Sequence, residues 1–229
     1  MRLQTPSCLL VGLGMLLAVG DAVGQGTFQN LDFEQATVPP TPVNGYGDEV
    51  DPALAFPGWS VSASTSTNPL CRLYTLYNSQ TLDSPAVDLF GPLFPNGMGY
   101  PSLQGLYSAA LQYSGFFRVF PYLSQTGLVP DDARSISVLV PSGTDWWQWP
   151  SVNLNGVYIP LTPIGDGRVG GDVTAFAGTT ADLTLSTGTY FAYFDDVQFS
   201  DQPIPEPGVL GLAALGASLV GWRVVRRRR

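Results

Sequence analysis

The groups that could do chemistry in this chain are carboxylates and aromatic rings, because none of its 229 residues is histidine or lysine. The usual general base, Schiff-base chemistry and any triad that uses histidine are therefore excluded. The two cysteines, Cys8 and Cys71, are too few for a thiolate zinc site. Two close carboxylates could still hydrolyse a glycosidic bond, but aspartate is also typical of solvated turns. We therefore expect no enzyme, and a carboxylate-based glycoside hydrolase is kept as an alternative.

Three tryptophans gather in the segment 145–150, which has the sequence DWWQWP. Aspartate and proline at its two ends place this segment in a loop or at the end of a strand. Exposed flat rings can stack on sugars, and binding sites combine such rings with a few polar groups. The segment therefore predicts glycan contacts by Trp146, Trp147 and Trp149. In the alternative interpretation, two of these rings lie in the core and the third lies at its border.

Between residues 25 and 203 the chain is strongly acidic, with four arginines against sixteen carboxylates and a formal charge of −12. Such a charge repels nucleic acid and anionic membranes, so we expect no nucleic-acid partner. Only Cys71 lies in this part, which excludes an intrachain disulfide. The roughly 180 residues are enough for one domain with a sizeable core.

Short segments in which polar and apolar residues alternate indicate β-strands throughout this part. Residues 135–140 alternate in this way, and Asn155-Gly156 at the centre of 152–159 indicates a hairpin with a tight turn. Many short strands separated by glycine, proline and aspartate are typical of a sandwich or a barrel. We expect a single all-β ectodomain over residues 25–200.

Two further segments carry more specific expectations. Residues 190–199 form an aromatic-rich strand, in which period-two alternation would place Phe191, Tyr193, Val197 and Phe199 on one face. Residues 171–178 are the best candidate for a short helix, because Asp172 can cap its start and Gly178 can end it.

The two ends of this part resemble those of jelly-roll domains of the galactose-binding and carbohydrate-binding kind. The resemblance lies in QNLDFE at 29–34, FPGW at 56–59 and FDDVQF at 194–199. It implies a jelly-roll β-sandwich whose first and last strands are neighbours. It also implies that carbohydrate is a ligand class to consider.

In such jelly rolls, a structural Ca²⁺ is often held between the glutamate of the first strand and an aspartate of the last. The resemblance therefore implies Ca²⁺ ligands at Glu34 and Asp196, with Asp195 as the alternate. Oxygen ligands of this kind suit Ca²⁺. The alternative is a salt link or a solvated sheet edge.

The start of the chain is typical of a secretory signal peptide. Arg2 is followed by an apolar stretch over 9–20 and then by the small residues around Gly24. We expect residues 1–24 to be removed on export.

The end of the chain is typical of a membrane anchor. A proline-rich linker over 201–207 precedes an apolar stretch over 208–225 and then Arg226, Arg227, Arg228 and Arg229. At about 1.5 Å per residue, this stretch spans about 27 Å, close to the roughly 30 Å of a bilayer core. A basic cluster after such a stretch stops transfer and stays in the cytoplasm. We expect one transmembrane helix over 208–225 and a cytoplasmic tail over 226–229.

This tail resembles the PEP-CTERM sorting signal of bacteria, whose three parts are Pro205-Glu206-Pro207, the apolar helix and the arginine cluster. The resemblance implies an exosortase as partner, a membrane enzyme that would cut near the Pro-Glu-Pro motif. A single-pass membrane protein that is never cut is the alternative.

Together these features predict an exported, membrane-anchored surface or extracellular-matrix protein, associated with exopolysaccharide. A carbohydrate-binding module with a defined glycan ligand is the first alternative to this function.

Overall fold

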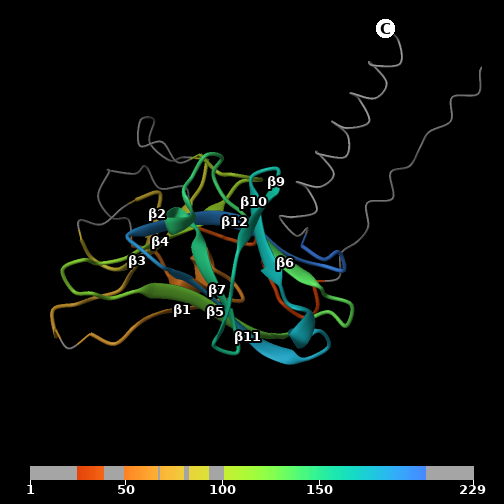
Figure 1. Cartoon of the computed structure of the whole chain (residues 1–229). Helices are drawn as coiled ribbons and strands as arrows, with labels where there is room; N and C mark the ends of the chain where they lie inside the picture. The colour runs from red at the N-terminus through yellow and green to blue at the C-terminus, as the bar shows by residue number, and fades with distance from the viewer. Residues whose placement is uncertain (1–24, 39–48, 67, 80–82, 93–100, 205–229) are drawn as a thin grey trace, which may run out of the picture.

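The computed structural model describes residues 25–38, 49–66, 68–79, 83–92 and 101–204, which form an all-β sandwich (Figure 1). One sheet has five strands in the order β1-β5-β11-β7-β8, and the other has seven in the order β2-β3-β4-β12-β6-β10-β9. All pairings of these strands are antiparallel except that of β2 with β3. The all-β prediction is confirmed.

The strands of the five-stranded sheet are β1 (Ser60–Ala63), β5 (Pro121–Leu128), β7 (Pro150–Leu154), β8 (Val157–Ile159) and β11 (Thr180–Thr187). Those of the other sheet are β2 (Tyr74–Tyr77), β3 (Ala86–Phe90), β4 (Ser108–Gln112), β6 (Ser135–Leu139), β9 (Thr162–Gly165), β10 (Arg168–Asp172) and β12 (Phe191–Ser200). The described helical segments are α1 (Pro52–Ala55) and the 3₁₀ turns η1 (Trp146–Gln148) and η2 (Thr174–Phe176).

The opening segment of the described chain closes the sandwich against its last strand. The backbone N–H of Val197 in β12 donates to the carbonyl of Leu31 at 2.9 Å. Phe28 stacks on Phe199 of β12, with ring centroids 5.2 Å apart. The opening segment thus lies beside the last strand, but residues 25–38 form turns and no strand, and β1, the first described strand, belongs to the other sheet. The described residues therefore do not show the neighbouring first and last strands that the jelly-roll resemblance implies.

Phe33 is the centre of the aromatic core. Its ring is fully buried and lies 5.8 Å from Trp59, 5.9 Å from Phe194 and 6.1 Å from Phe56, measured between ring centroids. The indole N–H of Trp59 donates to the carbonyl of Asn30 at 2.9 Å, so this buried polar group is satisfied.

The expectation that four residues of β12 share one face is wrong. The register of β12 shifts between Asp195 and Gln198, and Asp196 has a positive φ of 43°. An irregularity of this kind interrupts the alternation of side chains. Val197 and Phe199 therefore join Phe194 in the core between the sheets, whereas Tyr193 packs with Phe90 and Ala110 in a separate cluster.

The predicted strand near residue 135 and the predicted Asn-Gly turn are confirmed. Residues 135–139 form β6, and the hairpin of β7 and β8 turns at Asn155 and Gly156, which both have positive φ. The expected helix over 171–178 is reduced to the single turn η2. Asp172 still accepts a hydrogen bond from the backbone N–H of Thr174 at 2.8 Å.

The sorting features lie outside the described residues: the signal peptide, Pro205-Glu206-Pro207, the stretch 208–225 and the four terminal arginines. Within the part of the chain that is described, no helix is long and apolar enough to cross a bilayer. The linker is described as far as Ile204. Its start lies against the domain, since the Ser135 hydroxyl donates to the carbonyl of Gln202 at 2.7 Å.

We predict that Phe33→Ala lowers the free energy of unfolding by about 3–5 kcal/mol, because it removes a buried ring that three other rings contact. Urea unfolding of the purified protein measures this change. Leu70→Ala is the control, and its 81% exposed side chain should leave stability within about 0.5 kcal/mol. Similar values for the two variants would contradict the central place of Phe33 in the core.

Candidate functional site

A pocket of about 360 Å³ lies beside η1, at the start of β7. Its walls come from three parts of the chain: the tryptophan segment, the hairpin of β7 and β8 with the residues after it, and the turn before β12. The lining residues are Trp146, Trp147, Trp149, Pro150, Ser151, Tyr158, Leu161, Gly188 and Thr189. The volume falls at the lower end of the range of small-molecule sites, about 300–1,000 Å³.

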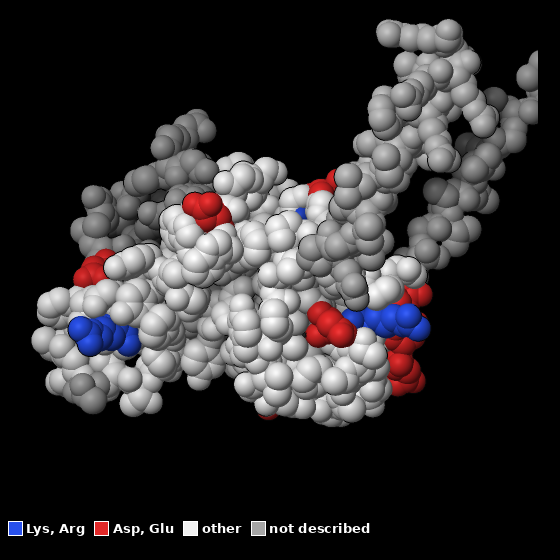
Figure 2. Space-filling view, in the orientation of Figure 1, with Lys and Arg blue, Asp and Glu red and all other residues white. Residues whose placement is uncertain are grey.

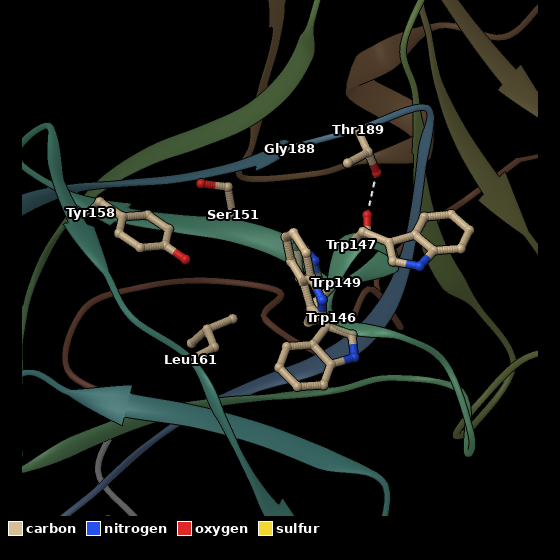
Figure 3. Close-up of a pocket in the computed structure, with 9 residues that line it drawn as sticks. Trp146, Trp147, Trp149, Ser151, Tyr158, Leu161, Gly188 and Thr189 are labelled. Atoms are coloured by element: carbon tan, nitrogen blue, oxygen red, sulfur yellow. Dashed lines mark hydrogen bonds between the residues drawn. The ribbon is translucent and has the colours of Figure 1, made fainter.

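A tight turn presents the tryptophans. The backbone N–H of Gln148 donates to the carbonyl of Asp145 at 2.9 Å, and the Gln148 side chain accepts from the N–H of Asp145 at 3.3 Å. The hydroxyl of Thr189 donates to the carbonyl of Trp147 and ties η1 to the turn before β12 (Figure 3). These bonds hold the backbone of the segment in place and do not occupy the faces of its rings.

The rings of Trp146 and Trp149 face Tyr158 and Leu161 across the open space of the pocket (Figure 3). Trp146 is 74% exposed and Tyr158 is 58% exposed, whereas Trp149 is half-buried and packs against the core. Two large rings thus remain exposed on opposite sides of one pocket. Such an arrangement can hold a flat ligand between aromatic faces.

Trp147 differs from its two neighbours. Its ring extends away from the space between Trp146 and Tyr158 (Figure 3), and its indole N–H donates to Asp145 at 3.0 Å. The segment is therefore neither a platform of three parallel rings nor a segment with two rings in the core.

The polar groups of the pocket are neutral. Ser151 and Tyr158 offer hydroxyl groups, and Thr189, whose hydroxyl donates to Trp147, can still accept. None of the nine lining residues carries a charge. Hydroxyl groups that both donate and accept match the hydroxyls of a sugar. An uncharged wall favours a neutral ligand over an ionic one.

Sequence reasoning found the tryptophans but missed Tyr158, Leu161 and Thr189. Tyr158 had a signal that could have been used. In the strand after the predicted Asn-Gly turn, neighbouring side chains point to opposite faces of the sheet. Ile159 is buried, so Tyr158 before it points to the outer face. Thr189 gave no signal, because it meets the tryptophans only through the pairing of β11 with β7.

Glu34 and Asp195, two of the three predicted calcium ligands, support the segment that leads into β4. Glu34 Oε1 accepts hydrogen bonds from the backbone N–H groups of Leu106 at 2.8 Å and Tyr107 at 3.0 Å. Asp195 Oδ2 accepts from the hydroxyl of Ser108 at 2.8 Å. Hydrogen-bond donors thus occupy these carboxylate oxygens.

Asp196, the third predicted ligand, forms an ion pair with Arg168. The guanidinium donates to Asp196 Oδ2 at 2.8 Å and to the carbonyl of Asp196 at 2.5 Å. Over the described ranges, no three acidic, cysteine or histidine side chains are grouped so that they could hold a metal. At Asp196 the structure shows the alternative, a salt link, and calcium binding at Glu34, Asp195 and Asp196 stays a prediction.

Two buried carboxylates have raised pKa values. Burial raises the pKa of Asp195 from 3.8 to about 7, and the charge of Asp196 adds to the rise, although hydrogen bonds from Ser108 and two backbone N–H groups oppose it. Burial also raises the pKa of Asp88 in β3 well above its usual value. Both oxygens of Asp88 are buried and lack a hydrogen-bond partner. Neither residue lines the pocket.

We predict that Asp195 lowers the stability of the protein as the pH rises from about 4 to about 7. Its folded-state pKa is raised, so the folded state binds the proton more tightly than the unfolded state, and its contribution is lost as that proton leaves. Asp195→Asn should flatten the profile of unfolding free energy in this window, by at most about 1.4 kcal/mol per pH unit.

Urea unfolding of both proteins across the window tests this prediction. Asp201→Asn, at an exposed position, is the control and should keep the wild-type profile. Parallel profiles for wild type and Asp195→Asn would show that the pKa of Asp195 is not raised.

Comparison with known proteins identified no relative of this chain. No protein-family model, curated protein or solved structure matches the chain. The tryptophan pocket is thus the feature of the described chain on which a function can best be based.

Proposed function

We propose that this protein is an exported surface or extracellular-matrix protein whose β-sandwich binds a polysaccharide through the tryptophan pocket. The observation that carries this proposal is the pair of exposed rings, Trp146 and Tyr158, on opposite sides of an uncharged pocket. Burying apolar surface stabilises a protein or a complex by about 25 cal/mol for each Å², and exposed rings do not gain this free energy. A ligand that covers both rings would recover that free energy.

The chemistry of the pocket favours binding over hydrolysis. A glycoside hydrolase needs two carboxyl groups on either side of the scissile bond, and no acidic residue lines this pocket. Neutral hydroxyls and aromatic faces are suited to holding a neutral sugar. The excess of carboxylates elsewhere, −12 over residues 25–203, would weaken the attraction for an acidic polysaccharide.

The sorting features of the sequence belong to the same proposal. The signal peptide over 1–24 would export the chain, and the tail from Pro205 to Arg229 would retain it in the membrane until an exosortase cuts it. The jelly-roll interpretation is supported by the contact of Leu31 with Val197, which joins the opening segment to the closing strand.

We predict that Trp146→Ala weakens binding to the producing cell's own neutral exopolysaccharide by about tenfold or more, which corresponds to about 1.4 kcal/mol. Affinity electrophoresis in gels that contain the polysaccharide measures the change. Trp147→Ala is the matched comparison, since its ring extends away from the space between Trp146 and Tyr158, and binding should fall less than in Trp146→Ala.

Equal losses in the two tryptophan variants would contradict the assigned roles of their rings. An unretarded wild-type protein would refute glycan binding to this polysaccharide. Thermal melting of each variant identifies any loss that comes from unfolding.

We predict that the mature protein begins near Gln25 and ends close to Pro205-Glu206-Pro207. Intact-mass spectrometry of protein from the cell surface measures both ends. Replacing all three residues of the motif by alanine should leave the tail uncut and keep the protein in the membrane fraction. A mature wild-type chain that still carries Arg229 would favour the uncut membrane protein.

A further inference from the structure

A second group of aromatic residues, three of them exposed and two half-buried, adjoins the pocket where Tyr190 follows Thr189. It is formed by the turn between β4 and β5 and by the residue before β12, and we call it the aromatic shelf: Tyr113, Phe116, Phe117, Phe120 and Tyr190. Phe116 is 73% exposed and Tyr190 is 71% exposed. None of the features proposed so far explains why these rings face solvent.

Each ring of the shelf contacts at least one other ring of the shelf. Tyr113 lies 4.5 Å from Phe120 and 5.9 Å from Tyr190, and Phe116 lies 4.9 Å from Phe117, measured between ring centroids. Contacts at these distances stabilise aromatic pairs by about 0.5–1.5 kcal/mol. Tyr113, Phe120 and Tyr190 thus form one group of touching rings, and Phe116 and Phe117 form another. The two groups adjoin at Gly115, which lies beside the rings of Tyr113 and Tyr190 and directly precedes Phe116.

The backbone beneath the shelf is held in place. Ser114 and Val119 exchange backbone hydrogen bonds of 3.2 and 3.4 Å across the turn. Asp83 accepts at one carboxylate oxygen from the N–H groups of Gly115 at 2.9 Å and Phe116 at 3.2 Å. A surface that is ordered before binding loses less conformational entropy when a ligand arrives.

The shelf continues directly into the pocket. Thr189 lines the pocket and bonds to Trp147, and the next residue in the chain is Tyr190 of the shelf. The carbonyl of Tyr190 accepts from the N–H of Tyr113 at 2.9 Å, which joins this turn to the end of β4. Most of the surface seen in Figure 2 is uncharged, with charged side chains gathered mainly at its right-hand edge. One exposed cation, Arg118, belongs to the turn of the shelf itself.

We propose that the pocket and the aromatic shelf form one track that holds a polysaccharide along several consecutive sugar units. This inference rests on the proposed function, which it extends from a single pocket to a polymer. A free monosaccharide or a chain end would be covered by the pocket alone and would leave the shelf exposed. A polymer that crosses the pocket covers both surfaces, because they adjoin at Thr189 and Tyr190.

The test uses oligosaccharides made by partial hydrolysis of the producing cell's own neutral exopolysaccharide and separated by length. Isothermal titration calorimetry with the full purified protein should show affinity rising at least about tenfold between fragments of about two and about eight sugar units. Phe116→Ala and Tyr190→Ala should remove most of this gain and leave binding of the short fragments unchanged. Leu54→Ala, an exposed apolar residue of α1, is the control and should bind like wild type.

The outcomes separate the track from the pocket. Binding that depends on Trp146 but not on fragment length would overturn the track and leave the proposed function standing. Wild-type protein that binds no fragment would overturn both. A wild-type dimer in sedimentation velocity that Phe116→Ala converts to monomer would overturn the track in favour of a contact between two copies of the chain.

Discussion

The packing of the opening segment against the last strand is the interaction on which the rest of the structure depends. Cys71, the sole cysteine in the described chain, is a free thiol, so no covalent link closes the sandwich there. Closure comes from Phe33, which joins Trp59 and Phe56 to Phe194 of β12. Phe33 does so with a φ of 59°, a left-handed conformation that costs an L-residue about 1–2 kcal/mol. Burial of the ring, at about 1.5–3 kcal/mol, offsets that cost.

The same strand connects the core to the pocket and the shelf. Phe194 lies near the middle of β12, Tyr190 directly precedes the strand, and Thr189 before it contacts the tryptophan segment. β12 also lies between β4 and β6, so its position is fixed from both sides. Loop residues held in this way by a rigid strand are suited to binding. The aromatic surfaces thus take their geometry from the core, although few of their own side chains are buried.

The sequence predicted the features that depend on local chemistry. The Asn155-Gly156 turn, the alternation that gives β6 and the loop position of the tryptophans each follow from a few adjacent residues. The faces of β12 could not be predicted, because the register shift before Gln198 becomes visible only when its partner β6 is known. The pocket was predicted in part for the same reason: its tryptophans are local, but Thr189 reaches them through the sheet.

The placement of charge explains how an acidic domain can present a neutral binding surface. Asp145 accepts from the indole of Trp147, and Asp83 accepts from backbone N–H groups in the turn of the shelf. Neither carboxylate lines the pocket. Asp88 is enclosed between strands, where burial raises its pKa well above the usual value and so disfavours its charged form. Desolvating a carboxylate without a partner costs several kcal/mol. A ligand that covers only aromatic and hydroxyl groups avoids that cost, and a neutral polysaccharide is the polymer that meets this condition.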